Sequence, residues 1–169
     1  TAFLSVITFD SSARQVAPLT ELSAFQVPSI AASGTTALGE ALALLADRID
    51  TEVSKTTAAA KGDWKPLVFL MTDGSPTDDW QKGLEKRKKV RTGIMVACAA
   101  GHGADTSILK QITESVVALD TADQSTIKAF FKWVSSSVST GSQKVDQGQK
   151  EVSGLGDLPP PPPEVNVVL

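Results

Sequence analysis

Two short segments bring hydroxyl and carboxylate oxygens to places where a predicted strand ends or a predicted helix begins. Asp73 follows the apolar run at residues 67–71 in "FLMTDGSPTDDW", and Gly74 beside it lets the backbone turn toward a ligand. Thr35 and Thr36 lie in "SGTTALGEAL", a Gly-Thr loop that opens a helix. Oxygen atoms of these types are hard ligands. The two segments therefore predict a site for Mg²⁺, for Mn²⁺, or for Ca²⁺ if the cage is looser.

Helix capping is the competing interpretation of the same side chains. Asp78 and Asp79 directly precede a helix expected to start at Trp80, so we assign them as its cap and first-turn charge. Thr35 or Thr36 is in the same way an alternative N-cap for the helix that follows.

A metal-dependent phosphoester hydrolase is the alternative function, with Asp73, Asp78 and Asp79 around Mg²⁺. That chemistry also needs a base or a nucleophile. The only histidine, His102, lies in a Gly-rich loop, where a surface role is more usual than catalysis. The chain contains no G-x-S-x-G, Walker A or G-x-G-x-x-G motif, so the sequence favours a binding protein over an enzyme.

Alternating strand and helix patterns must position these residues. Short apolar runs at residues 3–9, 67–71, 94–99 and 116–119 predict strands covered on both faces. Helices are expected at residues 36–50, 80–90, 107–116 and 125–138, the first with an apolar stripe of Leu38, Ala41, Leu42, Leu45 and Ile49. This order predicts a doubly wound, mostly parallel α/β sheet with helices on both faces. Residues 16–22 instead predict an antiparallel edge strand in a hairpin.

Composition excludes some classes of protein. Hydrophobic residues make up 41% and charged residues 21% of the 169 positions, as in an ordinary globular domain, and no apolar run is long enough for a membrane helix. The net charge of −3 argues against a nucleic-acid platform, so the basic cluster at 82–91 is interpreted as a solvated helix face. Cys98 stands alone in an apolar run, which predicts a buried thiol and fits a reducing, cytoplasmic compartment. No signal peptide is visible.

The composition changes near residue 140. Gly, Ser, Gln and Lys dominate residues 140–158, which predicts a flexible linker after a domain at residues 1–139. Residues 159–163 are five consecutive prolines, expected to form a polyproline II rod, and "EVNVVL" follows. This tail, residues 159–169, is either a disordered terminus or a docking segment with a β-prone end.

Four segments carry a resemblance to a known family. "LSVITFDSSARQVAPLTEL", "SGTTALGEAL", "PLVFLMTDGSPTDDW" and "GADTSILKQI", in this order and spacing, resemble a von Willebrand factor A (vWA) domain over residues 1–138, and closely its tellurite-resistance TerY subgroup. The resemblance implies a Rossmann-like fold and a metal-ion-dependent adhesion site (MIDAS). That site uses a D-x-S-x-S motif after the first strand, a loop threonine and an aspartate after the fourth strand. Thr36 and Asp73 match the last two, and Thr35 is the less suitable threonine.

One part of the family pattern is missing. No D-x-S-x-S occurs; "DSSAR" at residues 10–14 is one register short and ends the family's second strand, so Ser11 and Ser12 are not those ligands. The family's first strand and first helix are therefore expected to be absent, and that strand would lie between residues 3–9 and 67–71. Its absence would leave two buried strand edges with unpaired N–H and C=O groups, and each unpaired group would cost about 1 to 3 kcal/mol. We therefore expect one of three arrangements: the sequence is part of a longer protein that contains the strand, or another chain supplies it, or "EVNVVL" folds back into its position.

The resemblance also implies a function. It indicates a cytoplasmic bacterial interaction module or scaffold in tellurite resistance or stress response, whose bound metal is completed by an acidic side chain of a partner protein. The TerY subgroup further implies association with a protein kinase and a PP2C-like phosphatase, and phosphorylation of exposed Ser or Thr. Neither nucleic acid nor membrane is expected as a partner.

Overall fold

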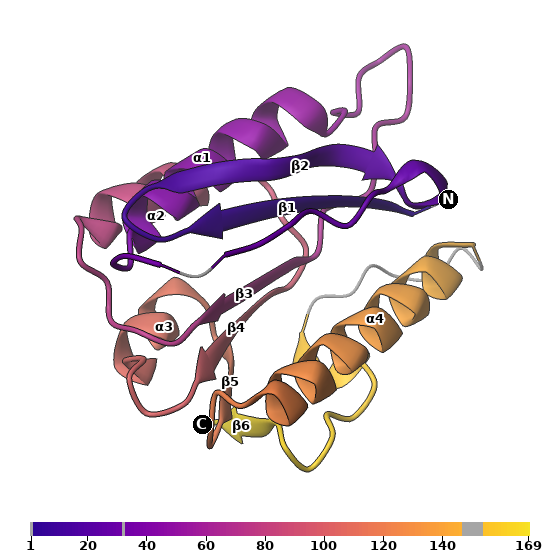
Figure 1. Ribbon diagram of the computed structural model, residues 1–169. Coiled ribbons are helices and arrows are strands. Elements are labelled where there is room, and N and C mark those ends of the chain that lie inside the picture. The colour runs from indigo at the N-terminus through magenta and orange to yellow at the C-terminus, as the bar shows by residue number, and fades with distance from the viewer. Residues whose placement is uncertain (1, 32, 147–153) are drawn as a thin grey trace. The chain divides into compact units, whose positions relative to one another are not determined.

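The structure is a computed structural model that describes residues 2–31, 33–146 and 154–169 (Figure 1). The chain divides into two compact units. The first comprises Thr1–Trp64 and Pro76–Arg91, and the second comprises Lys65–Ser75 and Thr92–Leu169. Each unit is described by itself.

The first unit combines a β-hairpin with two helices. Strands β1 (Phe3–Phe9) and β2 (Ala13–Glu21) pair antiparallel, which confirms the predicted hairpin. A short 3₁₀ helix, η1 (Leu22–Ala24), follows, and then α1 (Leu38–Glu52) packs on both strands and on α2 (Trp80–Lys88). The predicted apolar stripe of α1 is buried at Leu38, Ala41, Leu42 and Ile49 and half-buried at Leu45.

The two helices of this unit cross at a pair of glycines. A Cβ built on Gly83 would lie 2.0 Å from the carbonyl oxygen of Gly39, and one on Gly39 would lie 2.5 Å from the Asp79 oxygen. Any side chain at either position would force the helices apart, so the N-terminal ends of α1 and α2 meet only because both residues are glycine.

The second unit is built on a four-stranded sheet in the order β3-β4-β5-β6. Strands β3 (Val68–Thr72), β4 (Met95–Ala100) and β5 (Ser115–Leu119) are parallel, and β6 (Asn166–Val168) pairs antiparallel with β5. The unit also holds α3 (Thr106–Ile112), α4 (Gln124–Asp146) and a 3₁₀ helix, η2 (Leu155–Asp157). The strands predicted at 67–71, 94–99 and 116–119 are thus confirmed with small shifts at their ends.

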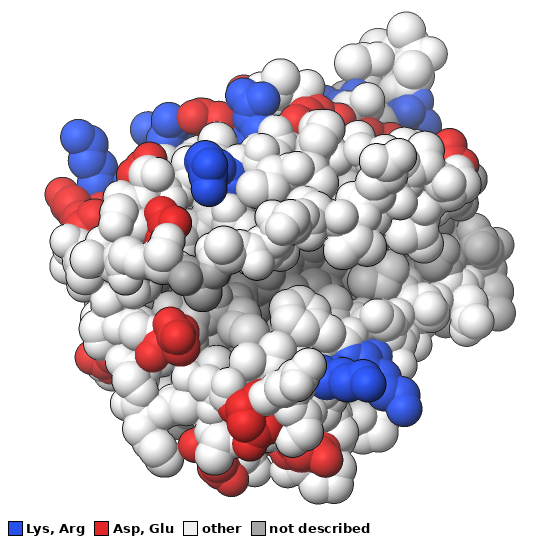
Figure 2. Space-filling view, viewed as in Figure 1, with Lys and Arg blue, Asp and Glu red and all other residues white. Residues whose placement is uncertain are grey.

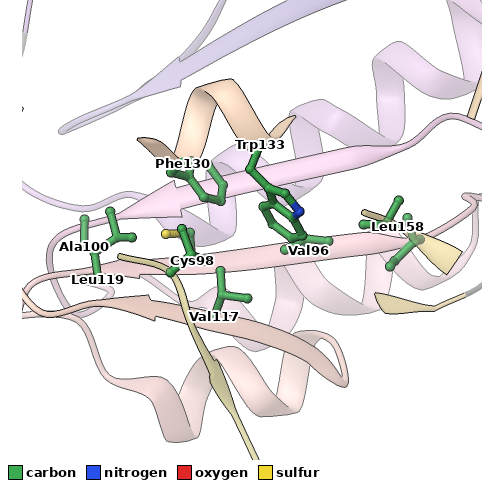
Figure 3. Packing of buried hydrophobic residues seen from close by; sticks show 10 residues of the cluster. Val96, Cys98, Ala100, Val117, Leu119, Phe130, Trp133 and Leu158 are labelled. Carbon is green, nitrogen blue, oxygen red and sulfur yellow. The ribbon is translucent and has the colours of Figure 1, made fainter. Parts of the chain in front are cut away.

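Helices cover both faces of this sheet. On one face Phe130 and Trp133 of α4 pack on a layer of strand side chains that Figure 3 shows: Val96, Cys98, Ala100, Val117 and Leu119. Alternate residues of a strand point to opposite faces, and α3, with Leu109 and Ile112 buried, contacts β4 and β5 on the other. The predicted α/β architecture is confirmed, with the hairpin of the first unit forming a separate sheet.

The prediction of a helix through Val116 is wrong. Helix α3 ends at Ile112 because Thr113 is extended (φ −152°, ψ 151°) and its hydroxyl donates to the Met95 carbonyl at 2.6 Å. Thr113 Oγ1 also accepts from the N–H of Ser115 at 3.2 Å, and Val116 lies in β5. One side chain thereby turns the chain from helix into strand.

Helix α4 is longer than predicted, since it continues past Val138 to Asp146 and includes the start of the segment assigned to a linker. Its hydroxyl residues bond to its own carbonyls: Ser137 Oγ donates to Trp133 O at 2.8 Å, and Thr140 Oγ1 donates to Ser136 O at 3.0 Å. Thr140 lies in the segment assigned to a linker, and this bond satisfies its hydroxyl within the helix. The division into domain, linker and tail otherwise stays a prediction, and residues 147–153 of the linker lie outside the described residues.

The fold-back of "EVNVVL" beside residues 67–71 is also wrong. The segment does fold back, but Asn166 pairs with Ala118 and Val168 with Val116, at the β5 edge of the sheet. Among the described residues, β1 pairs only with β2, and β3 only with β4, so neither has a strand on its other side.

Candidate functional site

The predicted ligand Thr36 lies in the loop that enters α1. Both backbone groups of Thr36 bond to Thr77: its N–H donates to Thr77 Oγ1 at 3.1 Å, and its carbonyl accepts from Thr77 N at 2.9 Å. The next N–H, that of Ala37, donates to the Asp10 carbonyl at 2.8 Å. The Thr36 hydroxyl makes no hydrogen bond to another residue that the structure describes. The backbone is therefore held while this oxygen stays available for a ligand.

The loop after β1 lies against the same segment. Ser11 Oγ accepts from the N–H of Thr35 at 3.3 Å and lies 3.4 Å from its hydroxyl. Gly34 has φ 78°, a conformation that favours glycine, and a Cβ there would lie 2.4 Å from Ser11 Oγ. Both the backbone conformation and the close contact therefore require glycine at this position. The pKa of Asp10 is lowered from its usual value, mainly because the N–H of Ser12 donates to its carboxylate. The sequence did not predict this contact between the loop after β1 and the loop before α1, because no local pattern indicates it.

Asp78 caps a different helix from the one predicted. Its carboxylate accepts from the N–H groups of Gly39 and Glu40, both at 2.9 Å, so it caps α1. The assignment of Asp78 to the helix at Trp80 is therefore wrong, whereas Asp79 does cap α2 by accepting from Lys82 N at 3.2 Å.

The alternative that Thr35 or Thr36 caps α1 is wrong as well. The N-cap residue is Ala37, and it makes no side-chain cap bond. Asp78 supplies the acceptor instead, which leaves the hydroxyl of Thr36 out of the helix cap.

The second predicted ligand, Asp73, follows β3 in the second unit. Its side chain is exposed and makes no hydrogen bond or ion pair within the described part of the chain. The turn around it is fixed by Thr72, which is buried and whose hydroxyl bonds to both the carbonyl and the N–H of Gly74. The loop after β4 meets this turn: a Cβ on Gly103 would lie 2.4 Å from Asp73 O, and Ser75 Oγ donates to Gly103 O at 3.4 Å. The carboxyl ends of β3 and β4 thus converge at Asp73, as they do in ligand-binding α/β sheets.

The two candidates have a donor chemistry that suits a hard cation. Thr36 offers a neutral hydroxyl in the first unit and Asp73 a carboxylate in the second, and neither oxygen is used elsewhere among the described residues. Two protein ligands leave most positions around Mg²⁺ or Ca²⁺ to water, other residues or a partner. No cluster of three or more His, Cys, Asp or Glu suited to a metal occurs in the ranges described. The joint site of Thr36 and Asp73 stays a prediction.

Comparison with protein families decides the classification. The model of the von Willebrand factor type A domain matches residues 1–146. The chain belongs to the von Willebrand factor type A family. Searches of curated proteins and of solved structures found no match. Domains of the von Willebrand factor type A family commonly mediate protein–protein interactions and often bind a divalent metal at a MIDAS, so the chain's membership is consistent with a metal-dependent interaction module.

Two other surface features of this vWA chain bear on partners. The basic cluster of α2 is partly neutralised, since Lys86 Nζ lies 3.1 Å from the Asp47 carboxylate, and basic and acidic side chains alternate over the first unit in Figure 2. This fits the solvated helix face predicted for residues 82–91. Within the described ranges, no helix has the length and hydrophobicity needed to span a membrane.

Proposed function

We propose that the protein is a metal-dependent protein-interaction module in which Thr36 and Asp73 hold a divalent cation, Mg²⁺ before Mn²⁺ or Ca²⁺. The observation that carries the proposal is the free oxygen on each residue, on a backbone that Thr77 holds at Thr36 and Thr72 holds at Asp73. A cation held by a hydroxyl and a single carboxylate keeps residual positive charge. An acidic side chain of a partner protein is the ligand that this charge attracts.

Calorimetric titration with MgCl₂ and MnCl₂ tests the site. Thr36→Val and Asp73→Asn should each weaken binding by at least about tenfold, because even outer-shell substitutions cost that much at metal sites. Thr35→Val is the matched control, since the Thr35 hydroxyl lies 3.4 Å from Ser11 Oγ and is already engaged. Unchanged affinity in Asp73→Asn, or equal losses in both threonine variants, would overturn the ligand assignment.

We propose binding rather than catalysis. The hydrolase alternative needs Asp78 and Asp79 as metal ligands, but their carboxylates accept backbone N–H groups at the starts of α1 and α2. That engagement supports a structural role for both. Incubation of the protein with p-nitrophenyl phosphate and Mg²⁺ is the check: turnover that Asp73→Ala abolishes would establish the hydrolase instead.

The biological setting is part of the proposal and follows from the resemblance to the TerY subgroup. We propose that the module acts in the bacterial cytoplasm, in tellurite resistance or stress response, as a scaffold or phosphorylation target for a protein kinase and a PP2C-like phosphatase. Increased tellurite sensitivity on deletion of the coding sequence, rescued by the wild type and not by Asp73→Ala, is the expected result. Equal rescue by both would separate this role from the metal site.

A further inference from the structure

The five prolines at residues 159–163 are not used by the metal site, and they lie on the second unit in a fixed position. Leu158 before them and Val165 after them are 7% and 4% exposed and belong to the same core as Trp133, and Figure 3 labels both Leu158 and Trp133 in this core. The Trp133 indole N–H donates to the Pro159 carbonyl at 2.9 Å. The rod is therefore anchored at both ends.

Exposure along this run repeats every third residue. Pro160 and Pro163 are exposed, whereas Pro159, Pro161 and Pro162 are half-buried. Residues 160–162 each precede a proline, which restricts them to extended backbone, and a polyproline II helix has about three residues per turn, so the rings of residues 160 and 163 lie on one edge. The rod ends there, because the N–H of Val165 donates to the Pro162 carbonyl at 3.0 Å and closes a turn over Pro163 and Glu164. The fold thus turns one edge of the rod outward and the others toward the protein.

The outward edge offers the groups that polyproline-binding domains use. Such domains have grooves lined by aromatic side chains, with Trp or Tyr donors for the carbonyls of the ligand. The carbonyls of Pro160 and Pro163 accept no hydrogen bond from another described residue. Within the chain, the Trp133 indole makes this type of bond to the half-buried Pro159.

We propose that the edge formed by Pro160 and Pro163 is a docking site for a partner protein with an aromatic-lined polyproline groove. Glu164 is exposed directly after the rod and favours a groove with Lys or Arg at that end. Because the rod is already ordered in the folded protein, it loses little conformational entropy when a partner binds. The docking site is independent of the metal site.

The test is titration of the full chain against a panel of purified SH3, WW and EVH1 domains, with EDTA present so that failure of the metal site has no effect. At least one domain should bind the full chain no more weakly than it binds a free peptide of residues 158–169. Pro160→Ala and Pro163→Ala should each weaken binding by about tenfold, the usual effect of truncating an anchor residue. Pro161→Ala, which removes a half-buried proline, is the matched control and should change affinity by less than about twofold.

Three outcomes would overturn the proposal. No domain of the panel binds the full chain; or the free peptide binds more tightly than the folded protein, so that the fold shields the prolines; or all three substitutions weaken binding equally. Circular dichroism of each variant confirms that the fold is retained. In any of these cases the run serves only to connect Leu158 to Val165 across the unit.

Discussion

Asp78 provides the sharpest test of how the first unit is held together. Its carboxylate accepts two N–H groups in the first turn of α1, from Gly39 and Glu40. Asp78→Ala removes both acceptors and a negative charge from the positive end of the helix dipole. The substitution costs more free energy at the N–H of Gly39, which is partly buried, than at the N–H of Glu40, which is exposed and can bond to water.

The size of the effect follows from these contacts. Loss of an N-cap acceptor costs about 0.5 to 2 kcal/mol. Loss of the favourable charge adds about 0.3 to 1 kcal/mol. Because water replaces one of the two bonds, we expect Asp78→Ala to lower the free energy of unfolding by about 1.5 kcal/mol. Asp79→Ala, which removes a single 3.2 Å bond at α2, should cost about half as much.

Urea denaturation followed by far-ultraviolet circular dichroism measures these differences, and calorimetric titration with Mg²⁺ on the same variants separates capping from metal binding. Asp73→Ala is the matched control, because an exposed side chain without a partner should change stability by less than about 0.5 kcal/mol. We therefore expect Asp78→Ala to lose stability and keep Mg²⁺ affinity, and Asp73→Ala to show the opposite. An Asp78→Ala protein with wild-type stability and the Mg²⁺ affinity of Asp73→Ala would refute the capping argument and make Asp78 a metal ligand.

Three further predictions concern the second unit. Val165→Ala should lower the free energy of unfolding by roughly 1.5 to 3 kcal/mol, because Val165 is 4% exposed in the core. The matched variant Val167→Ala should change it by less than about 0.5 kcal/mol, because Val167 is 46% exposed. Equal losses for the two variants in chemical denaturation would contradict the burial of Val165 in the core. The pKa of Asp123 lies well below its usual value in the folded protein, mainly because the Thr121 hydroxyl donates a hydrogen bond to its carboxylate. The ionised carboxylate therefore stabilises the fold at any pH above the pKa that Asp123 has in the unfolded chain. This stabilisation is lost as the pH falls through the pKa that Asp123 has in the folded protein. The stability difference between wild type and Asp123→Ala should accordingly be constant from about pH 5 to 7 and shrink below about pH 4, and a difference that grows in acid would contradict it. Burial raises the pKa of the Cys98 thiol to about 12. Ellman's reagent at about pH 8 should therefore label Cys98 only after denaturation. Rapid labelling of the native protein would show that Cys98 in β4 is exposed to solvent.

Short apolar strands were the part of the fold that the sequence predicted best. The strand expected at Phe3–Phe9 has those bounds in the structure, and the parallel strands of the second unit lie where apolar runs predict them. These runs are local signals, and burial on both faces of a sheet requires nearly every residue to be apolar. Strand β4 fits this reason, since all its residues are buried, whereas the prediction that β1 is covered on both faces is wrong, since none of its residues is buried and Phe3 and Leu4 are exposed.

Contacts between distant segments were harder to predict. Asp78 stands two residues before Trp80, and its local context fits a cap for α2 as well as it fits the cap of α1 that the structure shows. The bonds between Thr77 and Thr36 join two loops far apart in sequence, so periodicity carries no information about them. The same holds for "EVNVVL": its composition predicts a strand, but its partner, β5 and not β3, is a matter of topology.

The position of Leu158 and Val165 in the core has a consequence for synthesis on the ribosome. Strands β3, β4 and β5 and helix α4 all emerge before these two side chains. Until residue 165 has left the exit tunnel, the nascent unit exposes the apolar surface around Trp133 and an unpaired edge on β5, which are features that aggregate or recruit chaperones. A translational pause or a frameshift just before the prolines should therefore send more of this protein to degradation than an equal disturbance after residue 168.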